Sequence, residues 1–227
     1  MEKGNIKSKT IEYRTLKWGP CVVHFKADDK WIKSLLAEAE KSSISYGKHL
    51  AGHIKKEVQL DPIKYKEHFD RMFAIYNHAL RSWLRKEEKN SFLVTNLWCN
   101  FQKANEFNPP HDHSGTLSFV IYLKVPEMIQ KECAEHQKVK MSAGPGSISF
   151  FIGDSDRKNS ITQNTFLPMT GDCFIFPAWL KHWVCPFKSD CTRISVSGNV
   201  VDNIPLNLMS NEGVQSVLED IGKKTIE

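Results

Sequence analysis

The sequence contains no hydrophobic run long enough to cross a bilayer. Its longest nearly continuous apolar stretches, residues 119–123 and 174–180, fall well short of the about 20 residues that a membrane-spanning helix needs. The opening residues, MEKGNIKSKT, include no apolar segment of the kind found in secretion signals. We therefore expect no membrane partner and a cytoplasmic location.

The sequence also lacks closely spaced cysteines. Its six cysteines are dispersed and form no CxxC motif, which argues against a zinc finger. We predict free thiols in a reducing compartment. Cys185 and Cys191 lie on either side of a predicted turn at residues 187–190. They are the one pair that could face each other across a hairpin and form a disulfide.

Neither sign of charge dominates. The 31 lysines and arginines outnumber the 26 aspartates and glutamates only slightly, and they are scattered along the chain. Nucleic-acid-binding proteins concentrate positive charge on one surface, so nucleic acid is not an expected partner. With 41% hydrophobic and 25% charged residues, the 227-residue chain has the composition of a globular protein.

The first 90 residues combine a predicted strand pair with helices. Residues 10–16 and 21–26 have the pattern of strands. Asp28 or Asp29 is placed to cap a helix whose apolar residues recur at helical spacing. Asp61 and Pro62 open a second, longer helix, with proline at the first helical position, where its missing N–H costs nothing.

After residue 89, short segments rich in β-branched and aromatic residues predict strands. They are residues 91–101, 116–125, 147–152, 172–176, 182–186 and 191–201. The polar stretch 126–141 is predicted to be a long hairpin excursion, and the tail after residue 202 to carry a short helix near 215–221. Helices followed by many short strands predict an α+β fold, or a β-barrel or sandwich with helices on one face.

The densest group of functional side chains precedes an apolar strand. His111 and His113 are two residues apart, so in an extended segment both rings point to one side and Asp112 points away. Such a pair is able to chelate a metal ion. A further histidine, His182, follows an apolar strand and a proline corner.

A predicted strand after His182 has one polar face. Arg193, Ser195, Ser197 and Asn199 alternate with apolar residues, so they share one face of a strand. A fixed guanidinium on such a face suits a solvated pocket that binds an anion, because it meets a carboxylate through two hydrogen bonds. A solvent-facing sheet edge is the alternative.

Four collinear blocks between residues 96 and 201 resemble the iron(II)- and 2-oxoglutarate-dependent oxygenases. They are a His-x-His pair, a strand ending in Tyr-Leu and a proline (both within 111–126), a Gly-Asp strand leading through Phe-Pro to histidine (171–182), and an Arg-x-Ser strand (193–195). The resemblance is closest to a prolyl-hydroxylase-like branch found in bacteria and phages. It implies a double-stranded β-helix, the jelly-roll or cupin-like barrel, with the N-terminal helices against one sheet.

The resemblance also implies an iron site with one departure from the superfamily's His-x-Asp/Glu…His triad. His111, His113 and His182 would be the three ligands, with histidine at the position of the acid. Asp112 from a bent loop is an alternative ligand. A second register, starting at His113, would place Gly115 at the acid position and leave it vacant, as in the superfamily's halogenases.

By the same resemblance, Arg193 would pair with the distal carboxylate of 2-oxoglutarate, with help from Ser195. Tyr122 and Lys124, on the strand leaving the site, are further candidates for co-substrate binding. The implied cofactors are iron(II), 2-oxoglutarate and O2.

The implied function is a dioxygenase that hydroxylates a C–H bond of a protein side chain, such as a prolyl residue, or of a small metabolite. A non-enzymatic metal-binding cupin or structural jelly roll is the alternative. We expect a single domain over 1–227, with supporting elements in 1–90, the jelly roll in 91–201 and a tail in 202–227. The expected cytoplasm is that of the cell or of a phage-infected host, and the sequence does not indicate an oligomeric state.

Overall fold

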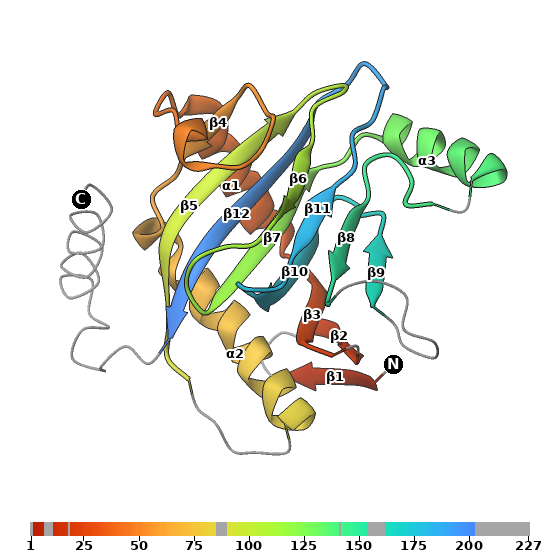
Figure 1. The fold of residues 1–227 in the computed structure, drawn as a ribbon. Helices are drawn as coiled ribbons and strands as arrows, with labels where there is room; N and C mark the ends of the chain where they lie inside the picture. The colour runs from red at the N-terminus through yellow and green to blue at the C-terminus, as the bar shows by residue number, and fades with distance from the viewer. Residues whose placement is uncertain are drawn as a thin grey trace.

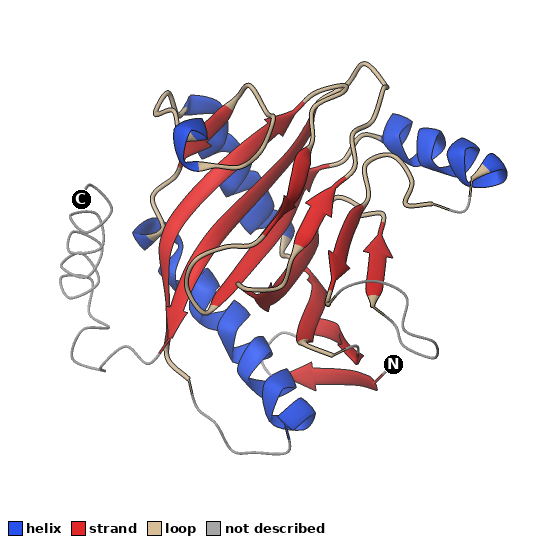
Figure 2. Cartoon of the chain, viewed as in Figure 1, coloured by secondary structure: helices blue, strands red, loops and turns tan. Residues whose placement is uncertain are grey.

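The computed structural model describes residues 2–6, 11–17, 19–84, 90–140, 142–153 and 162–202. In this part of the chain, two antiparallel β-sheets are accompanied by three α-helices (Figure 1; Figure 2). The helices are α1 (Asp29–Lys41), α2 (Lys66–Leu84) and α3 (Glu127–Val139). The strands are β1 (Glu2–Ile6), β2 (Ile11–Lys17), β3 (Cys21–Lys26), β4 (Glu57–Gln59), β5 (Phe92–Gln102), β6 (Asn108–His111), β7 (Leu117–Lys124), β8 (Ile148–Phe151), β9 (Gln163–Phe166), β10 (Asp172–Pro177), β11 (His182–Val184) and β12 (Arg193–Asp202).

The larger sheet has the strand order β1-β2-β3-β10-β7-β12-β5-β4, and the smaller one the order β6-β11-β8-β9. Two short strands from the first 90 residues, β3 and β4, therefore pair with strands from the second half of the chain. The six predicted strands after residue 89 are all present, as β5, β7, β8, β10, β11 and β12, with slightly different ends. β1, β4, β6 and β9 were not predicted.

Apolar side chains cover one face of the larger sheet and part of the other. One face packs against α1 and α2, where Leu35 and Met72 meet Phe119, Ile121 and other sheet residues. The other face packs against the smaller sheet through a second cluster: Val22, Val120, Tyr122, Ile148, Phe150, Phe174, Phe176, Leu180 and Val184. Helices on one face and a second sheet on the other agree with the predicted fold class.

The two predicted helices form, with one change at the start of the second. Asp28 caps α1 by accepting a hydrogen bond from the backbone N–H of Lys30 at 2.9 Å. The second helix was expected to begin at Pro62, but its first turn is a 3₁₀ turn, Ile63–Tyr65, and α2 begins at Lys66. Tyr65 donates its backbone N–H to the carbonyl of Pro62, three residues back, at 3.2 Å, which tightens this turn.

The predicted hairpin excursion at 126–141 is wrong, because Glu127–Val139 forms α3. Glutamate, glutamine and lysine are good helix formers, and Ile129 and Cys133, four residues apart, bury completely on one side of the helix. With only two apolar anchors, the helical period is weak in the sequence. The predicted helix near 215–221 lies outside the described residues.

Two further expectations concern the cysteines and the membrane. All six cysteines are free, including Cys185 and Cys191, as predicted. Among the helices of the described segments, none is both long enough and apolar enough to span a membrane.

Candidate metal and co-substrate site

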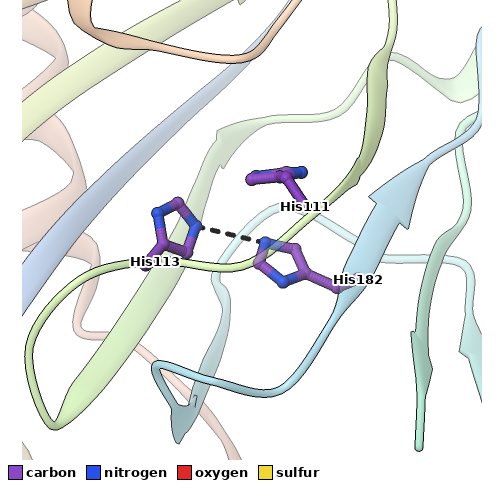
Figure 3. A group of neighbouring side chains, drawn as sticks. All are labelled: His111, His113 and His182. Atoms are coloured by element: carbon purple, nitrogen blue, oxygen red, sulfur yellow. Dashed lines mark hydrogen bonds between the residues drawn. The ribbon is translucent and has the colours of Figure 1, made fainter. Parts of the chain in front are cut away.

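Two paired strands of the smaller sheet bring the three predicted histidines together. His111 ends β6 and lies opposite His182, which begins β11. His113 follows two residues later, in a loop. Its backbone N–H donates to the carbonyl of Ala178 at 2.9 Å, and this hydrogen bond holds the loop in place. Figure 3 shows the three rings converging from these two segments.

The ring nitrogens are close enough to share one ion. The Nε2 atoms of His113 and His182 are 3.2 Å apart, and the potential ligand atoms of all three histidines lie within 4.8 Å of one another. Two nitrogens about 2.1 Å from an ion, at right angles, would be about 3.0 Å apart. The separation therefore fits two ligands of one metal ion.

Backbone carbonyls orient two of the rings. The Nδ1 atom of His111 lies 2.7 Å from the carbonyl of Pro109, and that of His182 lies 3.0 Å from the carbonyl of Leu180. A carbonyl oxygen only accepts, so Nδ1 carries the proton in each ring and Nε2 keeps its lone pair. This is how metal-binding histidines are commonly fixed in the required tautomer.

Burial keeps the imidazoles neutral. It lowers the pKa of His111, lowers that of His113 to about 3, and lowers that of His182 well below its ordinary value. The neighbouring imidazoles add to the effect for His113 and His182, because a second positive charge so close is unfavourable. Three neutral nitrogen donors suit iron(II), so the residues present fit this metal.

The two alternative positions for the second ligand, Asp112 and Gly115, lie outside the three-histidine group. Asp112 and the histidines border one cavity, but the side chain of Asp112 is exposed and is not part of the group. Gly115 has a φ of 92°, in the region that favours glycine, and a Cβ there would lie 2.5 Å from the carbonyl oxygen of Val200. The backbone turn by itself accounts for glycine at this position.

A cavity of about 210 Å³ lies beside the histidines, between the two sheets. The polar face predicted for β12 lines it, through Arg193, Ser195, Ser197 and Asn199. β5 adds a second row, because its Gln102, Asn100 and Trp98 lie opposite Arg193, Ser195 and Ser197 in the register. The cavity thus joins the metal-ligand candidates to a predominantly polar sheet surface.

Arg193 is a buried cation in this cavity, with 3% of its surface exposed. Its Nη1–H donates to the carbonyl of Gly146 at 2.7 Å, and its Nη2–H donates to the side-chain oxygen of Gln102. Its Nε–H has no hydrogen-bond partner, and no aspartate or glutamate in the described segments forms an ion pair with it. Burial lowers the pKa of this guanidinium, as expected for a charge without an acidic partner.

Of the other co-substrate candidates, the structure places two in the cavity and one outside it. Ser195 and Tyr122 lie opposite each other on β12 and β7, are buried, and both line the cavity. The Tyr122 ring centre is 5.3 Å from the Arg193 guanidinium, and burial raises the pKa of its hydroxyl to about 12. Lys124 ends β7 with an exposed side chain and is not brought to the cavity.

The sequence reasoning missed the polar residues contributed by β5 and β4. Asn100 and Gln102 are buried in the cavity wall, and Glu57 lies opposite Asn100 on β4. The alternation of Asn100 and Gln102 with apolar neighbours was a signal available in the sequence. Glu57 belongs to a strand of three residues, too short to show such a pattern.

Comparisons with known proteins agree with this architecture. The family described as "Putative 2OG-Fe(II) oxygenase" matches residues 96–199, a range that contains the three histidines and Arg193. No curated protein sequence matches the chain. The resemblance predicted from the sequence is confirmed by the family match.

Solved structures are similar to this chain at low sequence identity. A prolyl-4-hydroxylase from Pseudomonas putida superimposes with a TM-score of 0.50 and 14% identity, covering 79% of this chain and 92% of that one. The viral collagen prolyl hydroxylase from Paramecium Bursaria Chlorella virus-1, in complex with 2-oxoglutarate, has a TM-score of 0.48 and 14% identity, covering 81% and 96%. The likeness to the first structure confirms the predicted double-stranded β-helix fold.

Proposed function

We propose that the chain, whose residues 96–199 match the 2OG-Fe(II) oxygenase family, hydroxylates a C–H bond of its substrate. The chain is an enzyme of the iron(II)- and 2-oxoglutarate-dependent class, with iron(II), 2-oxoglutarate and O2 as cofactor and co-substrates. In the proposed reaction, one oxygen atom of O2 enters the C–H bond to give an alcohol. The other enters the new carboxylate of succinate as 2-oxoglutarate loses CO2.

His111, His113 and His182 are the proposed ligands. All three rings are neutral, and backbone carbonyls hold two of them, His111 and His182, so that Nε2 faces the site; both observations support this assignment. Asp112 is the alternative for the second ligand, and its exposed side chain makes it the weaker candidate. When bound, the iron supplies the activation of O2. The protein's contribution is to hold the ligands in one orientation and to keep the cavity largely shielded from water.

The observation that carries the proposal is the buried guanidinium of Arg193, without an acidic partner, in the same cavity as the three histidines. A charge buried in this way is costly unless a counterion is present during function. We assign Arg193 to the distal carboxylate of 2-oxoglutarate. Ser195 and Tyr122, on the same wall, are the proposed hydroxyl partners of the co-substrate.

The substrate class in this proposal is a protein side chain, such as a prolyl residue, or a small metabolite. The likeness to the prolyl-4-hydroxylase from Pseudomonas putida supports the first kind. A single domain over 1–227 and a cytoplasmic location remain predictions.

Two measurements test the proposal. Iron(II) with 2-oxoglutarate, added without oxygen, should give the weak visible charge-transfer band of the chelate, and succinate should form when O2 is admitted. A protein that binds iron(II) but shows neither the band nor 2-oxoglutarate binding by calorimetry would be a non-enzymatic metal-binding jelly roll.

A further inference from the structure

The end of the cavity beneath β4 contains a carboxylate that the proposed chemistry does not use. Glu57 is 4% exposed and lines the cavity, and its Oε2 atom has no hydrogen-bond partner. Other glutamates with restricted exposure are well partnered. Glu106 accepts backbone N–H groups from Lys55 and Lys103, and Glu132 accepts from the backbone N–H groups of two neighbouring residues and from a serine hydroxyl. Glu57 is therefore not explained as a structural acid.

Further hydrogen-bond acceptors surround this carboxylate. Asn100, opposite Glu57 in the sheet, has 5% of its surface exposed, and its Oδ1 atom lacks a partner. The Oδ1 atom of Asn108, in the same cavity wall, also lacks one. Buried polar atoms are almost always hydrogen-bonded, so this group of acceptors indicates a missing donor. A ligand that brings N–H groups to this end would satisfy these acceptors.

This end of the cavity is negative when Glu57 is ionised. Burial, with a smaller contribution from the carboxylate of Glu106, raises the pKa of Glu57 to about 7. A cation bound beside Glu57 would favour the ionised form. The ammonium of the adjacent Lys56 lies 4.0 Å from the centre of the Phe101 ring. No lysine or arginine in the described ranges forms an ion pair with Glu57. A cationic donor would satisfy both the charge and the hydrogen bonds.

Two aromatic rings line the same region. Tyr46 donates its backbone N–H to the carbonyl of Glu57 at 3.0 Å, and Trp98 lies two residues before Asn100 on β5. The two rings are stacked, with centres 5.7 Å apart, and both line the cavity. Tyrosine and tryptophan faces attract organic cations such as alkylammonium and guanidinium groups.

The carboxylate and the guanidinium occupy different parts of the cavity. β4, β5 and β12 are adjacent strands, and Glu57, Asn100 and Ser195 lie opposite one another across them. Strands about 4.8 Å apart place Glu57 roughly 10 Å from the strand that carries Arg193. The cavity thus has a cationic part for an anionic co-substrate and an anionic part beyond it.

We infer that Glu57, with Tyr46, Trp98 and Asn100, binds a cationic nitrogen of the substrate, an alkylammonium or guanidinium group. This inference rests on the proposed function, because it assigns the substrate of the same cavity. The nitrogen is carried either by a small amine or by a lysine or arginine side chain of a peptide. Bound at Glu57, it leaves the neighbouring part of the substrate to face the three histidines.

The loop over this end packs closely on the acceptors. A Cβ at Gly47 would come within 3.1 Å of Glu57 Oε2, and one at Gly52 would collide with Asn108 Oδ1. Glycine at these two positions therefore lets the loop approach Glu57 and Asn108.

Calorimetric titration with defined probes tests the inference. The probes are butylammonium and butylguanidinium, with neutral butanol as the isostere, and acetylated pentapeptides with a central lysine, arginine or norleucine. The wild-type protein, with and without iron(II) and 2-oxoglutarate under anaerobic conditions, is compared with Glu57→Gln. Glu40→Gln, which changes the same charge at an exposed site on α1, is the matched control.

The cationic probes should bind wild type and Glu40→Gln about 10-fold or more tightly than the neutral ones, and Glu57→Gln should remove this preference. The affinity of Glu57→Gln for 2-oxoglutarate should stay within about twofold of wild type, which also shows that it folds. Preference among the small cations identifies a metabolite, and preference for the charged peptides identifies a protein substrate.

Equal affinity for charged and neutral probes, or a preference that persists in Glu57→Gln, would overturn the inference. A normal charge-transfer band in the same samples would then leave the proposed function intact. Conversely, a Glu57-dependent preference without any band would refute the proposed function and support the cation site.

Discussion

Replacing Arg193 with methionine removes the guanidinium and keeps much of the side chain's length. In the structure this guanidinium is buried, donates to the carbonyl of Gly146 and to Gln102, and has one N–H group without a partner. If the distal carboxylate of 2-oxoglutarate binds here, the variant leaves that carboxylate desolvated and unpaired. Truncating one partner of such a pair typically costs about 2–5 kcal/mol.

At about 1.4 kcal/mol per decade, this loss weakens 2-oxoglutarate binding by roughly 30-fold at the least and by several thousand-fold at the most. Affinity for iron(II) measured without co-substrate should change little, because Arg193 is not part of the three-histidine group. Arg193→Lys should recover only part of the affinity, since an ammonium does not bind a carboxylate through two parallel hydrogen bonds.

Anaerobic calorimetry of wild type and both variants, with iron(II) and with 2-oxoglutarate, measures these affinities separately. Circular dichroism confirms that each variant is folded. Unchanged 2-oxoglutarate affinity in a folded Arg193→Met variant would refute the assignment of this cation and favour the non-enzymatic jelly roll.

The remaining predictions concern the metal, the pH dependence and the thiols. His182→Ala should abolish iron(II) binding, whereas His136→Ala, at a half-buried histidine of α3 outside the three-histidine group, should not. Full iron content in the first variant would contradict the ligand assignment. Asp112→Asn should keep the wild-type iron stoichiometry because its side chain lies outside the three-histidine group; loss of iron would make Asp112 the second ligand. Burial and Glu106 raise the pKa of Glu57 to about 7, so the folded state holds this proton more tightly than the unfolded chain, and stability falls as the pH rises through 7. At pH 8, Glu57→Gln should therefore raise the free energy of unfolding by about 1–3 kcal/mol in urea titrations. Below about pH 4 the substitution should give no gain, because Glu57 is then protonated in both states. A gain that does not depend on pH would show that the charge of Glu57 does not destabilise the fold. Thiol titration of unfolded, unreduced protein should find six free thiols, and a count of four would reveal a disulfide.

Local patterns in the sequence predicted β7, β11 and β12, which carry Tyr122, His182 and Arg193, but not β6, which carries His111. Alternation predicted the polar face of β12, because side chains of a strand point to opposite sides wherever the strand lies. The His-x-His pair and the histidine after the proline corner were visible in the sequence, but the resemblance to the oxygenase family was what joined them into one ligand set. The helical period of α1 followed from its apolar spacing and the Asp28 cap.

Patterns with few anchors were misread or missed. α3 lies where a hairpin was expected; it buries only Ile129 and Cys133, and its other apolar residues, such as Met128 and Val139, are exposed, so they form no helical stripe. The 3₁₀ turn before α2 depends on how the chain enters the helix, which the Asp61-Pro62 pair did not reveal.

Tertiary structure alone decided what surrounds the histidines. β6 and β11 pair across about 70 residues of sequence, and only this pairing places His111 opposite His182. In the same way, the three-residue strand β4 pairs with β5, some 40 residues further along, and brings Glu57 beside Asn100. The sequence by itself determined which residues share a face of each strand, because that depends on neighbours two positions apart. Which faces meet across the cavity depends on long-range strand pairing, and no local pattern in this chain encodes it.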